Sequence, residues 1–284
     1  MLNSLLINKS SEILIESVIS NLPNAILLLG SKYSQKPEIA KYVASKILKT
    51  NIETLYEPRF TLIQPKNDSI GIDKVRDIKM FTKLKIGGNN KKRVIVILKA
   101  DKLTIEAQAA LLKLVEEPHE NMHFIFTAHN VNLLLPTLVS RTQKVQLYPI
   151  SKNQALEYLS KKGINQQTSI KIYTTSGGNS GLITSEQNIQ KRQQSLHFAK
   201  SWLSNDTYER LRINTTIVND NIEDFITSLS LIYELGLNAA LSKQKDQKQI
   251  KKWYTGLQKI HKIVQELRNR PQNKLLLTHL AIEL

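Results

Sequence analysis

Cysteine is absent from this chain of 284 residues. Without cysteine, neither a disulfide nor a thiolate zinc site can form, and the absence fits a reducing compartment. We therefore expect no bound metal.

Long hydrophobic runs are also missing, and we expect no leader segment. No stretch approaches the roughly 20 continuous apolar residues that a membrane-spanning helix requires. The first residues, Met1–Leu5, show no basic segment followed by an apolar one. A cytoplasmic location is the expectation.

Acidic residues are outnumbered, because 24 Asp and Glu stand against 40 Lys and Arg and give a formal net charge of +16. Such an excess attracts nucleic acid or acidic protein surfaces without choosing between them, and solubility explains it equally well. The densest basic segments are residues 79–93 and 243–252. Only 6% of the residues are aromatic, so rows of rings for stacking single-stranded bases are not expected.

The first half of the chain alternates short apolar runs with helical patterns. Such alternation is typical of a parallel sheet covered by helices, so the fold class of this part is α/β. The expected strands are residues 25–29, 59–63, 94–98, 123–127 and 144–147. The expected helices are residues 8–20, 36–48, 73–84, 104–117 and 131–139, with Asp73 and Thr104 as N-caps.

After Pro149 the strand signal disappears and the remaining segments show helical patterns. A small helical segment has helices near 152–162 and 166–175, followed by a glycine-rich break at 176–181. Long amphipathic helices follow it. The predicted domains are residues 1–150, 151–189 and 190–284.

The apolar run 25–29 leads into a degenerate phosphate-binding loop. Residues 30–37, Gly-Ser-Lys-Tyr-Ser-Gln-Lys-Pro, overlay the pattern G-x-x-x-x-G-K-[ST]. Gln35 replaces the second glycine, and Pro37 replaces the hydroxyl residue that binds magnesium, whereas Gly30 and Lys36 remain. Lys36 is either a phosphate ligand or a surface lysine in the first turn of a helix, and we favour the surface lysine.

A second apolar run, Val94–Ile97, ends in Leu98 and Lys99, where a nucleotide hydrolase needs acidic residues to hold magnesium and polarise water. Asp101 is the nearest acid, and its expected role is a turn before the next helix. We therefore expect neither hydrolysis at this end of the sheet nor a bound cofactor.

Three stretches carry a family resemblance. Val94–Pro118, which ends in Ala-Leu-Leu-Lys-Leu-Val-Glu-Glu-Pro, resembles the AAA+ clamp-loader subunits of bacterial DNA polymerase III. Ile70–Arg76 is similar to the segment ahead of that strand, and Leu134–Thr142 resembles Leu-Leu-x-Thr-x-x-Ser-Arg-Cys. The resemblance is specific over residues 20–150 and architectural beyond 190. It implies an AAA+ domain, a small helical lid and an all-α collar for oligomerisation.

Within that family, gamma and tau subunits keep a working P-loop, whereas delta-prime subunits have a degraded nucleotide site and keep the Ser-Arg-Cys motif. The chain is similar to the delta-prime branch, although Thr142 replaces the cysteine and the four-cysteine zinc module is missing. The resemblance implies a subunit that does not hydrolyse ATP and whose Arg141, beside Ser140, completes the ATP site of a neighbour. Gly181 stands where active relatives carry a nucleotide-sensing arginine.

The resemblance also implies partners: other clamp-loader subunits, the sliding clamp, and primed DNA through the assembly. Two alternatives stay open, namely an ATP-hydrolysing subunit of the gamma or tau kind that uses Lys36, and a free-standing basic DNA-binding protein. For Arg141 alone, the alternative is a salt bridge at a strand end.

Overall fold

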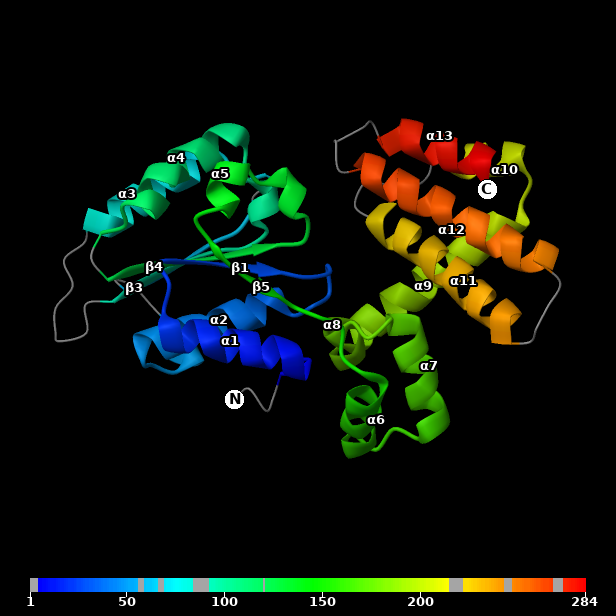
Figure 1. The fold of residues 1–284 in the computed structure, drawn as a ribbon, viewed down its shortest axis with the longest axis horizontal. Helices are drawn as coiled ribbons and strands as arrows, with labels where there is room; N and C mark the ends of the chain where they lie inside the picture. Colours follow the sequence, from blue (N-terminus) through cyan, green and yellow to red (C-terminus); the bar gives the residue numbers. More distant parts are fainter. Residues whose placement is uncertain are drawn as a thin grey trace. The chain divides into compact units, whose positions relative to one another are not determined.

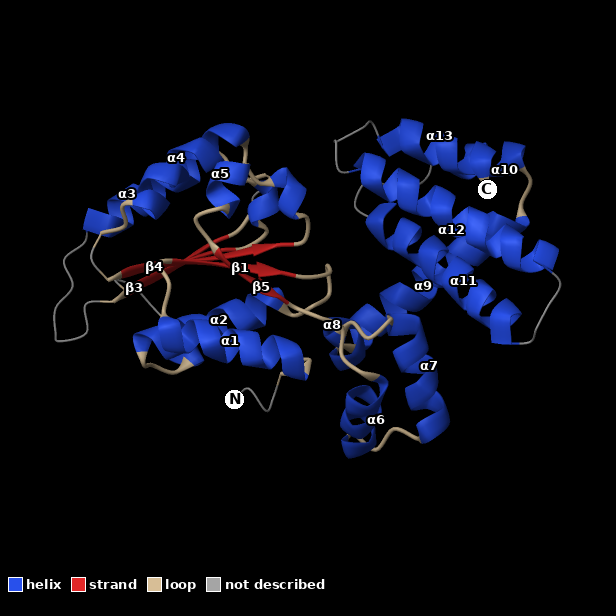
Figure 2. Cartoon of the chain, viewed as in Figure 1, coloured by secondary structure: helices blue, strands red, loops and turns tan. Residues whose placement is uncertain are grey.

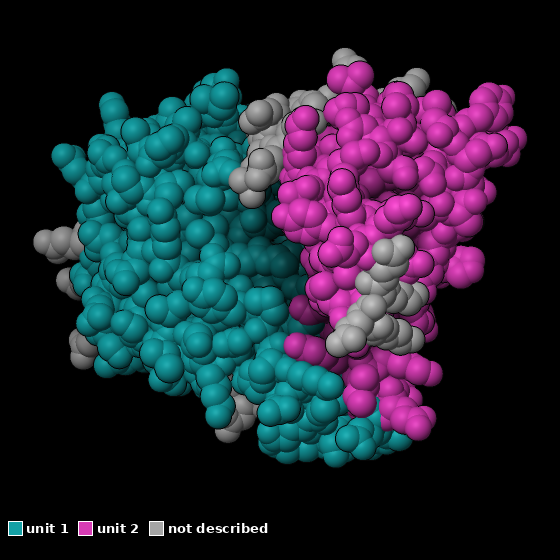
Figure 3. All heavy atoms as spheres, turned by 45° about the vertical axis from the view of Figure 1, so that its right-hand side comes forward, with its two compact units in different colours: residues 1–166, 178–184 teal, residues 167–177, 185–284 magenta. Residues whose placement is uncertain are grey.

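The computed structural model describes residues 5–55, 59–65, 69–83, 92–119, 121–214, 222–242, 247–267 and 273–284. The chain divides into two compact units, drawn in teal and magenta in Figure 3. Unit 1 comprises Met1–Gln166 and Gly178–Thr184, and unit 2 comprises Gln167–Gly177 and Ser185–Leu284. The division into three domains stays a prediction. The basic segments 79–93 and 243–252 lie partly outside the described residues.

Unit 1 is built on a five-stranded parallel sheet in the order β2-β3-β4-β1-β5 (Figure 2). The predicted α/β class is confirmed, and each predicted strand lies within one residue of the observed one. The strands are β1 (Ala25–Leu29), β2 (Phe60–Ile63), β3 (Arg93–Ile97), β4 (Met122–Ala128) and β5 (Gln143–Gln146).

Helices cover both faces of this sheet (Figure 1). On one face lie α1 (Lys9–Asn21) and α2 (Lys36–Leu48), and on the other α3 (Ile72–Lys83) and α4 (Ile105–Glu116). Side chains alternate between the two resulting cores, so that Leu27 packs with α3 and α4 whereas Ile26 and Leu28 pack with α1 and α2. The central strands are therefore apolar throughout, as expected for a sheet buried on both sides.

Two predicted helix starts have different outcomes. Thr104 caps α4, because its side-chain oxygen accepts a hydrogen bond from the backbone N–H of Ala107 at 3.2 Å. Asp73 is not the N-cap of α3, since this helix begins at Ile72 and places Asp73 in its first turn. A carboxylate there still interacts favourably with the helix dipole.

The helix predicted over residues 131–139 is wrong as a single element. The chain instead forms a 3₁₀ turn, η4 (Val131–Leu133), and then a separate short helix, α5 (Pro136–Val139). Leu135 between them is extended, with φ −60° and ψ 133°. Proline disfavours the helical conformation in the residue before it, which explains the break.

The chain beyond Pro149 is helical, as predicted. Its helices are α6 (Lys152–Lys161), α7 (Gln166–Ser176), α8 (Ser180–Thr184), α9 (Glu186–Ser204), α10 (Thr207–Asn214), α11 (Ile222–Ser242), α12 (Gln247–Leu267) and α13 (Asn273–Glu283). Unit 1 also contains two 3₁₀ turns, η2 (Ile52–Thr54) and η3 (Ala100–Lys102). The predicted break at 176–181 is shorter than expected, because α8 already begins at Ser180. Gly177 and Gly178 form the break at φ 58° and 75°.

The core of unit 2 contains a buried arginine. Arg192 on α9 is only 7% exposed. Its guanidinium donates to the side-chain oxygen of Ser228 at 2.9 Å, to the carbonyl of Thr175 at 3.2 Å and to the carbonyl of Thr227 at 3.3 Å. One side chain thus connects α9 with α7 and α11.

Among the described residues, Asp224–Ser242 of α11 is long and apolar enough to span a membrane by length and composition. The sequence alone did not lead us to expect such a stretch. Phe225, Ile226 and Leu229 of this helix are buried in the core of unit 2. The buried share of the apolar stretch is 39%, so one face of α11 belongs to the core of unit 2.

His123 gives the stability of unit 1 a pH dependence. Its ring lies in β4, is 6% exposed, and has Nδ1 3.1 Å from the carbonyl oxygen of Pro23. Burial lowers the pKa of His123. At a pH below the ordinary histidine pKa of about 6.5, the unfolded chain binds a proton that the folded chain resists.

We therefore expect the free energy of unfolding to be fully retained above about pH 6.5 and to fall as the pH drops below it. Urea unfolding at about pH 7.5 and about pH 5.5 measures the loss. His123→Gln, which keeps a donor for Pro23, should reduce the loss, whereas His261→Gln at an exposed site serves as the control. Equal losses in wild type and His123→Gln would contradict the assignment.

Candidate functional site

The predicted site residues lie at opposite ends of the parallel sheet. Gly30 and Lys36 follow the carboxyl end of β1, whereas Arg141 precedes the amino end of β5. β1 and β5 run in parallel with Ile26 opposite Gln143. At about 3.3 Å per residue, the two ends are about 15–20 Å apart. Arg141 is therefore too far away to act on the loop of its own chain.

The loop after β1 keeps a conformation that favours glycine at the position of the missing second glycine. Gln35 has φ 52°, the left-handed conformation that glycine adopts most easily. Gly30 is required by close packing, because a Cβ there would lie 2.5 Å from the side-chain oxygen of Ser34 and 3.1 Å from Cβ of Leu147.

The interpretation of Lys36 as a surface lysine is wrong. This side chain is only 6% exposed. Its ammonium donates to the carbonyl of Gly30 at 2.9 Å, to the side-chain oxygen of Ser34 at 3.2 Å and to the carbonyl of Ser31. An ammonium group has three N–H donors. Lys36 thus stabilises oxygen atoms of its own loop.

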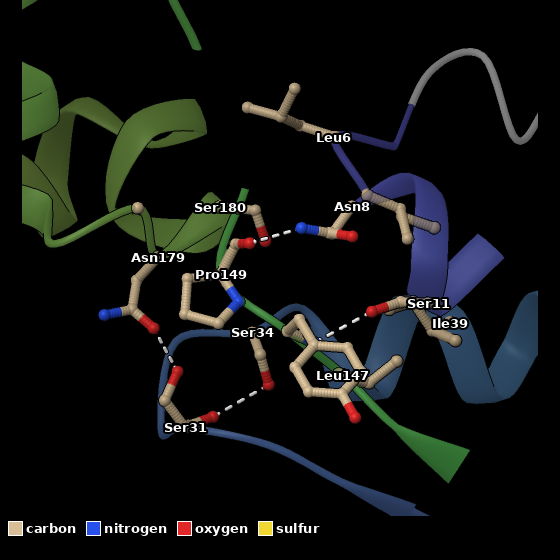
Figure 4. Close-up of a pocket in the computed structure, with 13 residues that line it drawn as sticks. Leu6, Asn8, Ser11, Ser31, Ser34, Ile39, Leu147, Pro149, Asn179 and Ser180 are labelled. Carbon is tan, nitrogen blue, oxygen red and sulfur yellow. Dashed lines mark hydrogen bonds between the residues drawn. The ribbon is translucent and has the colours of Figure 1, made fainter. Parts of the chain in front are cut away.

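Residues 178–184 of unit 1 lie directly on this loop. The backbone N–H of Gly181 donates to the carbonyl of Tyr33 at 2.7 Å, and the side-chain amide of Gln35 donates to Thr184 at 3.2 Å. Figure 4 shows a third contact, in which the hydroxyl of Ser31 donates to the side chain of Asn179. A Cβ on Gly181 would lie 2.6 Å from the carbonyl oxygen of Tyr33. This packing excludes a larger side chain at position 181.

The cavity left between the loop, residues 178–180 and the start of α1 is small (Figure 4). It measures about 10 Å³ and is lined by polar groups that include Asn8, Ser31 and Asn179. A single buried water needs about 10–15 Å³ by this measure. The space suits one water molecule and is far too small for a nucleotide.

The two residues that follow β3, Leu98 and Lys99, carry no carboxylate. Leu98 is buried, and Lys99 is exposed with its backbone N–H bonded to the side-chain oxygen of Thr127 at 2.9 Å. Asp101 is buried in η3, and its Oδ2 accepts hydrogen bonds from the backbone of His129 at 3.1 Å and of Asn130 at 3.2 Å. Asp101 thus joins the turns after β3 and β4, beyond the single turn that was predicted.

Within the part of the chain that the structure describes, no group of three or more His, Cys, Asp or Glu side chains is placed to hold a metal ion. A magnesium nucleotide normally relies on carboxylate or hydroxyl ligands in addition to its phosphates. Of these ligand types, the described contacts of Lys36 include one hydroxyl, that of Ser34, and no carboxylate.

Arg141 occupies the other end of the sheet, in a turn that its neighbours fix. The hydroxyl of Ser140 donates to the carbonyl of Thr137 at 3.0 Å, and Thr142 donates from its hydroxyl to the carbonyl of Val139 at 2.8 Å. Both hydroxyls are thus satisfied within the turn. Thr142 replaces the cysteine of the resembling motif without leaving a polar group unpaired.

The guanidinium of Arg141 contacts three groups of its own chain, one of which is the side-chain oxygen of Ser140, 3.5 Å from Nη1. Nη2 lies 2.6 Å from a carboxylate oxygen of Glu116, the last residue of α4, and Nη1 donates to the carbonyl of Thr137 at 2.9 Å. The side chains of Arg141 and Glu116 are 38% and 40% exposed. The predicted alternative, a salt bridge at a strand end, is thus present, and the guanidinium still reaches solvent.

Arg141 and Glu116 line an open groove of about 470 Å³ at the amino end of the sheet. Other lining residues are Pro23, Asn24, Ala25, Val115, Ser140, Thr142 and Gln143. Sequence reasoning named Arg141 and Ser140 but gave Glu116 no role. The available signal was its place in the family-like stretch just before Pro118, which does not reveal a contact with Arg141.

Residues 8–151 match the family described as "DNA polymerase III, delta subunit". A DNA polymerase III subunit delta' from Haemophilus influenzae is 36% identical over 106 residues, covering 37% of this chain and 32% of that protein. A replication factor C small subunit from Methanosarcina barkeri is 28% identical over 210 residues, covering 72% of this chain and 59% of that protein.

Among solved structures, a DNA polymerase III gamma subunit-related protein from Thermotoga maritima aligns with a TM-score of 0.49 at 15% identity. The alignment covers 94% of this chain and 97% of the other. The match to the Haemophilus influenzae protein spans about a third of that relative's length.

Proposed function

The chain belongs to the DNA polymerase III delta subunit family, and among clamp-loader subunits it is similar to delta-prime; from this we propose that it supplies Arg141 to the ATP site of a neighbouring subunit. It does not hydrolyse ATP itself. Its α/β domain is of the AAA+ P-loop type, with helices after it. The assembly it serves loads the sliding clamp onto primed DNA during replication.

The single observation that carries this proposal is the contrast between the two ends of the sheet. At the carboxyl end, the cavity beside the loop after β1 measures about 10 Å³, and Gly181 packs against the backbone of this loop. The amino end opens into a groove of about 470 Å³ that contains Arg141. An arginine at the end away from its own loop is suited to a nucleotide held by another chain.

The chemistry of Arg141 matches this role. A guanidinium stays charged and presents its N–H groups as a rigid fork that fits phosphate oxygens. In phosphoryl transfer, negative charge develops on the oxygens of the γ-phosphate, and an arginine from a neighbour stabilises it. Ser140 contributes by fixing the turn through Thr137.

The closed loop supports the absence of hydrolysis by this chain. Lys36 donates to Gly30, Ser31 and Ser34. Leu98 and Lys99 stand where magnesium and water require acids. The further proposals are a cytoplasmic location, a lid role for residues 151–189, a collar role for residues 190–284, and contact with the sliding clamp and primed DNA through the assembly.

The alternative is an ATPase of the gamma or tau kind, which the retained Lys36 and the left-handed Gln35 would favour. Calorimetric titration separates the two, and we expect no heat of binding at millimolar Mg·ATP. Asn179→Ala, which removes the contact with Ser31, should also fail to bind, because the magnesium ligands are still missing. Saturable binding by wild type would favour the ATPase.

The other alternative, a free-standing DNA-binding protein, predicts strong salt-dependent DNA affinity for the isolated chain. Our proposal predicts that such affinity is weak in the isolated chain and belongs to the full assembly.

A further inference from the structure

We propose that Glu116 is a latch for Arg141: it holds the guanidinium in a charge-neutralised position until the phosphate of a neighbour's nucleotide displaces it. The inference rests on the proposed function of Arg141, and it adds a regulatory residue on the same chain. Glu116 would thus set how readily the guanidinium of Arg141 binds the phosphate of the neighbour's nucleotide.

The contacts favour a held arginine over a freely extended one. Glu116 accepts from Nη2 at 2.6 Å, and Thr137 accepts from Nη1 at 2.9 Å. Charge-assisted bonds of this length are among the stronger hydrogen bonds in proteins. Two acceptors on different elements, one at the end of α4 and one in α5, fix the orientation of the guanidinium plane.

The position of Glu116 on its helix argues against a role in stabilising α4. Glu116 is the last residue of α4, where the partial negative charge of the helix end disfavours a carboxylate. Its interaction with Arg141 offsets this cost. A neutral glutamine would suit the helix end at least as well, so the carboxylate is better explained by the arginine that it binds.

The latch must also be weak enough to open. Both side chains are more than a third exposed, and they line an open groove. Exposed ion pairs contribute little and are screened by salt, so removing this one should shift a competing equilibrium by about two- to fivefold. A phosphate carries more negative charge than a carboxylate and can bind the same fork bidentately. It can therefore replace Glu116 at Arg141.

The first test uses the isolated full chain and inorganic tripolyphosphate as the probe. Tripolyphosphate is titrated while the side-chain Nε resonance of Arg141 is followed by NMR. Glu116→Gln should tighten binding about two- to fivefold, because the competing carboxylate is gone. Glu117→Gln is the matched control, since it removes the same charge from an exposed neighbouring side chain. Equal affinities in the two variants would overturn the latch.

The second test measures ATP turnover in the reconstituted assembly. Glu116→Gln should raise turnover at subsaturating ATP about two- to fivefold relative to Glu117→Gln, with a smaller effect at saturation. A decrease would mean that Glu116 positions Arg141 productively, and it would overturn the latch.

The two proposals fail in different ways. If Arg141→Ala abolishes stimulation while Glu116→Gln matches Glu117→Gln in both tests, the latch is wrong and the trans-acting arginine stands. If Arg141→Ala leaves turnover unchanged while Glu116→Gln tightens tripolyphosphate binding, the ion pair competes with phosphate but the proposed function is wrong.

Discussion

Replacing Arg141 by alanine in a reconstituted clamp loader should lower DNA-stimulated ATP hydrolysis by about 10³- to 10⁵-fold at the one site that this arginine serves. The loss arises because a fixed positive fork is removed from the charge that develops on the γ-phosphate. Folding should be unaffected, since Arg141 is partly exposed and its ion pair with Glu116 is near the surface. Single-turnover measurement separates this site from others in the assembly.

Two further variants sharpen the test of Arg141. Arg141→Lys keeps the charge but loses the bidentate geometry, so it should recover only part of the activity. Lys144→Ala removes a nearby exposed positive charge on β5 and should leave turnover unchanged. Size-exclusion chromatography must show an intact assembly for every variant. Full turnover with Arg141→Ala, or an equal loss with Lys144→Ala, would refute the assignment.

Replacing Arg192 by methionine should lower the stability of unit 2 by about 1–3 kcal/mol. Arg192 is 7% exposed, and its guanidinium satisfies Thr175, Thr227 and Ser228 on two other helices. Methionine fills part of the volume but leaves these acceptors without their donor. Acceptors in and beside the core that lose their charged partner account for most of the expected cost.

Chemical denaturation followed by the fluorescence of Trp202, which is buried in unit 2, measures this loss. Lys191→Met is the matched control, because it makes the same substitution at the adjacent exposed position. The control should change the free energy of unfolding by less than about 0.5 kcal/mol. A similar small change for Arg192→Met would show that the buried contacts contribute little.

The sheet could be predicted from sequence because its signals are local. Each strand is a short apolar run followed by a helical pattern, and a strand buried on both faces must be apolar throughout. The helix predicted over residues 131–139 failed for an equally local reason, since Pro136 forces Leu135 into an extended conformation. That rule was available from the sequence and was outweighed by the apolar pattern.

The site was predictable in its residue types but not in its contacts. The missing glycine and hydroxyl of the loop are visible in the sequence, and so is Arg141. The burial of Lys36 was not, because it depends on carbonyl groups that turn toward the lysine only in the folded loop.

The contacts of residues 178–184 with the loop after β1, and the contact of Glu116 with Arg141, were hidden for a related reason. Ser31 and Asn179 are 148 residues apart in sequence, and no local pattern indicates that they meet. Glu116 and Arg141 belong to different helices and turns, so only the tertiary arrangement shows that a carboxylate faces the arginine.

The separation of the two ends of the sheet has a consequence for stoichiometry. Under the proposed function, the chain receives no nucleotide at one end of the sheet and offers Arg141 at the other, so it activates one neighbour and is not activated in return. Each copy incorporated into a closed assembly would therefore add one stimulated site while taking the place of one catalytic member. In two adjacent copies, Arg141 of one copy would face a neighbour without a nucleotide and would stimulate no hydrolysis.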